Sequence, residues 1–132
     1  MKYTLTFGYI NKVAPNIAEI IMDEQSTISV EQYYEYREFI ENHFIQPYAV
    51  LINCVNKSDF DEEVLSHIVK SNALCALASI NYNKENIRVS NEFINLVKGN
   101  NFSMKTFSAF ELGRAKAIEW LQLELLKNKE NV

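Results

Sequence analysis

With 132 residues, the chain has the commonest size of a single domain, and 48% hydrophobic with 23% charged residues is the composition of a globular protein. Its net charge of −4, without a basic stripe, argues against nucleic-acid binding. The longest apolar run, at positions 73–80, is far shorter than the roughly 20 residues that span a membrane. Because the first residues also lack the pattern of a secretion signal, we expect a cytoplasmic protein without membrane insertion.

The amino-terminal third predicts two strands and a helix. Apolar residues alternate with polar ones at positions 3–9, which predicts a strand, and a second strand is expected at 17–23. The segment 11–16 between them contains Pro15 and predicts the turn of an antiparallel hairpin. Ser29 and Gln32 have the spacing of a capping box, which predicts a helix that ends at His43 or Phe44.

The rest of the chain alternates strands with helices. Apolar runs at 48–55 and 73–82 predict strands covered on both faces, and each precedes a helical pattern. We expect Ser58 or Asp59 to cap the first of these helices, and the second to occupy 84–98. A fifth strand is expected at 103–107, and Ser108 with Glu111 offers a capping box for a last helix.

The order of elements is therefore ββαβαβαβα. It predicts an α/β fold with a single mixed, mainly parallel five-stranded sheet and an N-terminal antiparallel hairpin. We expect one domain at residues 1–127 and a frayed C-terminal tail at 128–132.

This order, together with the segment Val50–Glu63 (VLINCVNKSDFDEE), resembles the STAS family, named for sulfate transporters and anti-sigma-factor antagonists, and its STAS-like bacterial relatives. In family members that act as switches, a serine in an Asp-Ser-Ser-Gly type of motif accepts phosphate where the second helix starts. Matched without gaps, that motif falls here on Asp61, Glu62, Glu63 and Val64. The resemblance thus implies a bacterial regulatory or scaffolding domain that lacks the phosphoacceptor serine and is not switched by phosphorylation.

Two surfaces are candidates for a protein partner. Carboxylates at the start of the second predicted helix imitate part of a phosphoserine's charge, although the simpler interpretation is that they stabilise a short helix. Tyrosines beside Arg37 on the first predicted helix have the composition of an interface hot spot, while Tyr33 is expected to face the sheet. The candidate partner-binding residues are Ser58, Asp59, Asp61, Glu62, Glu63, Tyr34 and Tyr36.

A ligand site is the alternative. Open α/β sheets bind ligands outside the carboxyl ends of their strands, where this sequence places a candidate crevice of Asn56, Asn81, Asn83 and Ser108. The sequence therefore favours two functions: a regulatory or scaffolding domain that acts by protein–protein interaction, or a small-molecule or lipid-binding module that uses a crevice between sheet and helices.

The spacing of the residues does not support a catalytic, phosphate-binding or metal site. Cys54 and Cys75 lie in apolar runs and are expected to be buried free thiols. Histidine, serine and cysteine have no catalytic spacing, and neither a glycine-rich phosphate loop nor a metal-ligand pattern occurs. We therefore expect no enzymatic activity, no cofactor and no metal. Trp120 lies off the inward face of the last predicted helix, as do Leu112, Leu123 and Leu126, which suits packing against the third predicted helix or against a second subunit in a homodimer.

Overall fold

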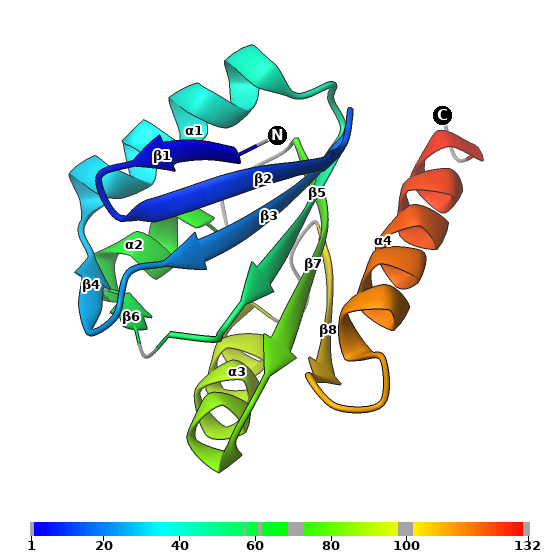
Figure 1. Ribbon diagram of the computed structural model, residues 1–132. Coiled ribbons are helices and arrows are strands. Elements are labelled where there is room, and N and C mark those ends of the chain that lie inside the picture. Colours follow the sequence, from blue (N-terminus) through cyan, green and yellow to red (C-terminus); the bar gives the residue numbers. More distant parts are fainter. Residues whose placement is uncertain (1, 57, 61, 69–72, 98–101, 131–132) are drawn as a thin grey trace.

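A computed structural model describes residues 2–56, 58–60, 62–68, 73–97 and 102–130, which form a mixed sheet with helices on both faces (Figure 1). The sheet has six strands in the order β1-β2-β3-β5-β7-β8. They span Lys2–Leu5, Gly8–Ala14, Ile17–Met22, Tyr48–Asn53, Leu74–Asn81 and Ser103–Ser108. The short strands β4 (Ser26–Ile28) and β6 (Ser58–Phe60) pair in parallel as a second, two-stranded sheet. The helices are α1 (Val30–His43), α2 (Glu62–Ile68), α3 (Lys84–Val97) and α4 (Gly113–Glu130).

The α/β class, the antiparallel start and the parallel remainder are confirmed, but the five-strand count is wrong. The alternating segment at 3–9 is two strands, because the chain turns at Thr6 and Phe7 between β1 and β2. Gly8 opens β2 with a φ of 153°, and a Cβ there would lie 2.1 Å from the Ile21 carbonyl oxygen. Glycine is required because no side chain fits where β2 approaches β3 so closely. Most of the turn expected at 11–16 belongs to β2.

Two helix starts also differ from the sequence-based expectation. Ser58 and Asp59 lie in β6 rather than capping α2, which begins at Glu62. The last helix begins at Gly113 instead of Ser108, because Glu111 and Leu112 have φ values of 57° and 63° and turn the chain first. At the other end, α4 continues past residue 127, where we placed the end of the domain.

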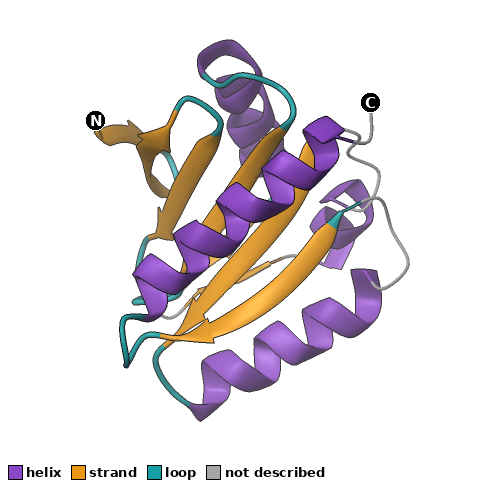
Figure 2. Ribbon diagram, turned by 90° about the vertical axis from the view of Figure 1, so that its right-hand side faces the viewer, coloured by secondary structure: helices purple, strands orange, loops and turns teal. Residues whose placement is uncertain are grey.

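Successive parallel strands are added in one direction across the sheet, and three helices therefore cover the same face (Figure 2). β3 pairs with β5, β5 with β7 and β7 with β8, all in parallel, and one helix crosses over between the members of each pair. Because such crossovers are right-handed, successive steps in the same direction place α1, α2 and α3 on the same side. α4 follows the last strand and covers the opposite face.

The two faces therefore bury two hydrophobic cores. The core beneath α1, α2 and α3 includes Ile20, Tyr33, Ile40, Val50, Leu77 and Phe93. The core beneath α4 includes Leu51, Ala78, Ile80, Ala117, Leu121 and Leu125. Burial of Tyr33 against the sheet is thus confirmed.

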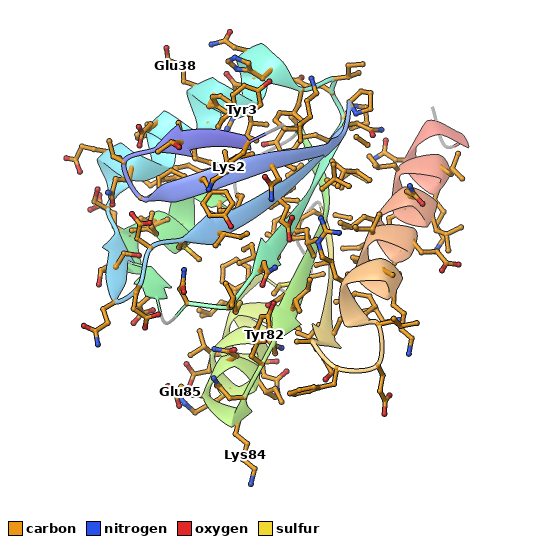
Figure 3. All side chains as sticks on the ribbon, viewed as in Figure 1. Lys2, Tyr3, Glu38, Tyr82, Lys84 and Glu85 are labelled. Carbon is orange, nitrogen blue, oxygen red and sulfur yellow. The ribbon has the colours of Figure 1, made fainter. Side chains whose placement is uncertain are left out.

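The edge hairpin is fixed to α1 by aromatic contacts. Tyr3 of β1 lies beside α1 in Figure 3, and its ring centroid is 4.9 Å from that of Phe39. The capping box that starts α1 is confirmed, since the Gln32 backbone N–H donates to Ser29 Oγ and the Gln32 side chain accepts from the Ser29 backbone N–H.

Candidate functional site

A cleft opens on the three-helix side of the sheet, near the carboxyl ends of β3, β5 and β7, and holds about 330 Å³. One wall is α3, and β4 and β6 contribute side chains opposite. The carboxyl ends of β5 and β7 point toward α3 in Figure 1, and Figure 3 shows Tyr82 where β7 ends, next to Lys84 and Glu85 of α3. The position agrees with the general preference of open α/β sheets for ligands at this end.

The lining of the cleft combines apolar and polar side chains. The apolar part consists of Met22, Ile52, Val89, Phe93 and Met104. The polar and charged part includes Gln25, Ser26, Thr27, Asn56, Asp59, Glu85, Asn86 and Arg88. An apolar surface with a few polar groups is the usual lining of a small-molecule site.

Buried polar groups form the deep side of the cleft. Ser79 Oγ lies 2.9 Å from Ser90 Oγ, and the Ser90 hydroxyl donates to Asn81 Oδ1 at 2.9 Å. Ser79 also lies within hydrogen-bonding distance of the Cys54 thiol, 3.6 Å from Sγ to Oγ. Ser79, Asn81 and Ser90 are buried, so their mutual hydrogen bonds offset the cost of removing them from water.

Cys54 is the side chain in the cleft with nucleophilic potential. Burial raises the pKa of its thiol, and the hydrogen bond with Ser79 only partly opposes this effect. A raised pKa keeps the sulfur protonated near neutral pH, whereas reactive cysteines are thiolates. The cleft is therefore suited to binding rather than to thiolate chemistry. Both cysteines are free thiols as expected, and Cys75 is buried, whereas Cys54 is only partly buried.

Some charged side chains at the mouth of the cleft form hydrogen-bonded ion pairs with one another. Arg88 donates to Glu85 at 3.1 Å and to Glu92 at 2.6 Å, along the exposed side of α3. Asn56 Nδ2 donates to the Met22 carbonyl oxygen at 2.9 Å and so joins the loop after β5 to the end of β3. These contacts hold the rim of the cleft in place.

The structure separates the four residues of the expected crevice. Asn56 lines the cleft, and Asn81 belongs to the polar network behind it. Asn83 instead caps α3, because its Oδ1 accepts from the Asn86 backbone N–H at 2.9 Å. Ser108 is exposed at the end of β8, where its hydroxyl accepts from the Phe110 N–H at 3.2 Å.

The expected partner-binding residues are also separated. Asp59 and Glu63 are exposed, and Asp59 lines the cleft. The backbones of Ser58 and Glu62 lie in β6 and α2, while Asp61 is outside the described residues. Tyr34 is 52% exposed, and its hydroxyl lies 3.0 Å from His67 Nδ1 of α2. Tyr36, expected at the surface, lines an apolar cavity beneath α1 instead.

The sequence analysis missed a charged cluster on the opposite face. Glu19, in the middle of β3, is only 2% exposed and accepts two hydrogen bonds from Arg114 of α4, at 3.0 and 2.9 Å. Asn53 and Asn11 donate to the same carboxylate at 3.0 and 3.2 Å, and the Tyr82 hydroxyl donates to Asn53 at 2.6 Å. The sequence feature that could have revealed this cluster is Glu19 itself, a lone acidic residue in the apolar segment Ile17–Met22.

The electrostatics of this cluster favour the ionised carboxylate. Burial raises the pKa of Glu19, but the hydrogen bonds from Arg114, Asn53 and Asn11 and the Arg114 charge together outweigh it. The pKa of Glu19 is therefore lower than its ordinary value. Because all the contacts join the sheet to α4 or to neighbouring strands, the cluster orients α4 on the sheet.

Comparisons with known proteins return no relative: no family model, curated protein or solved structure matches the chain. Within the described part of the chain, no group of three His, Cys, Asp or Glu side chains is placed to hold a metal ion. None of the described helices combines the length and apolar character needed to cross a membrane.

Proposed function

We propose that the chain is a small-molecule-binding domain whose ligand occupies the cleft between α3 and the carboxyl ends of β3, β5 and β7. The observation that carries this function is the cleft itself, with about 330 Å³ of space, a lining that combines apolar and polar side chains, and buried hydroxyl groups at its deep side. A volume of this size is within the range of pockets for small ligands. The mixed lining favours an amphipathic molecule that has both an apolar part and hydrogen-bonding groups.

Nuclear magnetic resonance with aromatic fragments tests this function. We expect heterocyclic fragments to shift the amide signals of residues 52–56 and 86–90, because these segments border the cleft. Val89→Trp fills the cleft from α3 and should abolish the shifts. Ile87→Trp is the matched control, since Ile87 is on the same helix, 46% exposed and outside the cleft lining. Shifts that persist in Val89→Trp, or that map to another surface, would refute the proposal.

The second candidate is the regulatory or scaffolding role, carried by the surface that α1 and α2 share. The exposed Tyr34 ring of α1 meets the His67 ring of α2 edge-on, with ring centroids 5.3 Å apart. Glu63 is also exposed on α2. An exposed aromatic residue that is held in place by a neighbour loses little entropy when a partner binds. The STAS resemblance, the cytoplasmic location and the homodimer stay predictions of the same kind.

A comparison of two variants tests the protein-binding role. We expect a cross-linked complex from native cytosol to form with the wild type and to be lost in Tyr34→Ser. Glu38→Ser serves as the control, because Glu38 is also exposed on α1 (Figure 3). A complex that survives Tyr34→Ser, or that both variants lose equally, would argue against this surface.

A further inference from the structure

α4 carries leucine side chains on the side that faces away from the sheet. Leu123 and Leu126 are 52% and 55% exposed, and Leu112, immediately before the helix, is 77% exposed. Figure 2 shows that none of the other described helices covers this side, because α1, α2 and α3 lie on the opposite face of the sheet. Packing of these leucines against the third helix, which the sequence allowed, is therefore excluded.

The inner side of the same helix fixes the direction in which these leucines point. Ala117, Leu121 and Leu125 are buried in the core beneath α4, and Arg114 donates two hydrogen bonds to the buried Glu19. These contacts hold α4 at one rotation about its own axis. A helix with apolar residues all round is typical of one that packs between two surfaces. The sheet is one of these surfaces, and a second molecule can supply the other.

The outward residues have the spacing of a contact between two helices. The row consists of Leu112, Lys116, Glu119, Leu123 and Leu126, which are separated alternately by four and three positions. The Lys116 backbone N–H donates to the Leu112 carbonyl oxygen at 3.0 Å, so Leu112 joins the first turn of the helix. A row with this spacing faces the second helix in a coiled coil. Its partner should therefore have apolar ends and opposite charges in the middle.

A second copy of the same row meets these requirements when it runs antiparallel. Lys116 is four positions after Leu112, and Glu119 is four positions before Leu123. A two-fold axis that places Lys116 opposite Glu119 of the second copy therefore also places Leu112 opposite Leu123 of the second copy. Because the symmetry repeats each contact, one register forms two ion pairs and two leucine contacts. A parallel two-fold pair would instead place each charge opposite its own copy.

Two further observations support the antiparallel register. Within the described part of the chain, neither Lys116 nor Glu119 forms an ion pair, so both charges are available to a partner. A shallow depression at the start of α4 is lined by Leu112, Ala115 and Glu119, among others. In this register it receives the side chain of Leu123 of the second copy. An exposed leucine of one copy thus meets a hollow in the surface of the other.

We propose that the outer side of α4 binds a second copy of this chain as an antiparallel, two-fold symmetric helix pair. The contact is confined to one helix and the residue before it, so it is small next to the roughly 1,600 Å² of a standard interface. The dimer is therefore weak and forms at micromolar or higher concentration. The cleft of the proposed function opens on the other face of the sheet and remains accessible in both copies, so the two proposals are independent.

Sedimentation velocity of the full-length chain, from micromolar to millimolar concentration, measures the association. We expect the wild type to change from monomer to dimer over this range. Leu123→Ser should weaken the dimer by about tenfold or more, because it removes both leucine contacts. Leu96→Ser is the matched control and should dimerise like the wild type, since Leu96 is an exposed leucine of α3. A wild type that is monomeric throughout, or a dimer that survives Leu123→Ser, would overturn the proposal.

Exchanging the charges tests the register. Lys116→Glu and Glu119→Lys each replace two attractions by two repulsions, so each variant alone should weaken the dimer about tenfold. A mixture of the two variants should form heterodimers, because every glutamate then faces a lysine, and the double variant should regain the wild-type affinity. Lys84→Glu makes the same charge change on α3 and should have no effect (Figure 3). Single variants that dimerise like the wild type, or a mixture that associates no better than its components, would refute the antiparallel pair.

Discussion

Glu19 shows how a single buried charge determines the position of a helix. The carboxylate accepts hydrogen bonds from Arg114 and from asparagines on two neighbouring strands, so its oxygen atoms are fully occupied. Arg114 is half exposed and keeps part of its hydration, which limits the cost of the pair. The arrangement is structural: it attaches the start of α4 to β3 at one defined register.

Glu19→Gln should destabilise the protein by about 2 kcal/mol at neutral pH, because Arg114 loses its ionic partner. The effect should depend on pH. The folded-state pKa of Glu19 is below its ordinary value of 4.5, so its stabilising contribution is complete above that pH and is lost as the pH falls through the folded-state value. Urea denaturation at pH 7 and at successively lower pH values measures the difference.

The control for this measurement is Glu38→Gln, an exposed carboxylate on α1 (Figure 3). It should change the free energy of unfolding by less than about 0.5 kcal/mol at any pH. A difference between wild type and Glu19→Gln that stays constant as the pH falls would contradict the assignment of an ionised, stabilised carboxylate.

Sequence patterns located polar residues but not their partners. Asn56 was expected at the carboxyl end of a strand, and the structure places it at the cleft. Glu19 and Arg114 are 95 positions apart, and no local pattern links them. Tyr36 was expected at the surface because helical spacing gives the direction of a side chain but not the depth of the cavity beneath it. Contacts between distant segments are therefore the part that sequence reasoning lacked.

The start of α4 illustrates what decides the bounds of an element. Ser108 and Glu111 have the spacing of a capping box, yet the helix begins at Gly113. A Cβ on Gly113 would lie 1.5 Å from the Ser108 carbonyl oxygen, so the loop folds back over the helix start. Local capping preferences amount to about 1 kcal/mol and are outweighed when tertiary packing selects another start.

Gly113→Ala should destabilise the protein by about 2 kcal/mol or more, because the added methyl group collides with backbone and the loop must move. Thermal unfolding followed by circular dichroism measures the change. Lys116→Ala, on the exposed side of the same helix, is the control and should be nearly neutral. A Gly113→Ala variant as stable as the wild type would show that the close approach to Ser108 is absent in solution.

Elements with strong periodicity were predicted well, and short ones were not. The capping box of α1 and the continuous apolar runs of β5 and β7 each have a pattern long enough to identify them. β4 and β6 have three residues each, so alternation has no room to develop, and they exist because they pair with one another. The split of residues 3–9 into two strands follows from Gly8, whose conformation a polar–apolar pattern does not encode.

At the scale of the whole molecule, the two hydrophobic cores share one sheet. Each strand in the middle of the sheet contributes alternate residues to both cores, as Val50 and Leu51 of β5 do. Loss of packing on one face therefore loosens strands that the other face requires. The protein should unfold as a single cooperative unit.

Two spectroscopic probes test this cooperativity. Trp120 is the only tryptophan and packs beside Phe107 in the α4 core, so its fluorescence reports on that face. Far-ultraviolet circular dichroism reports on helices of both faces. The two urea transitions should coincide in the wild type and in Ile40→Ala, which removes a buried side chain beneath α1. Separate transitions would contradict the single unit.

The order of strands in the sheet has a consequence for how the protein is made. From β1 to β8, each strand of the six-stranded sheet joins the one that precedes it in that sheet along the chain, and none is inserted between two earlier ones. A polypeptide leaving the ribosome can therefore extend its sheet one strand at a time, with the docking edge for each new segment already synthesised. Translation and assembly run in the same direction, and α4, which follows the last strand of the sheet, closes the face that is left open until then.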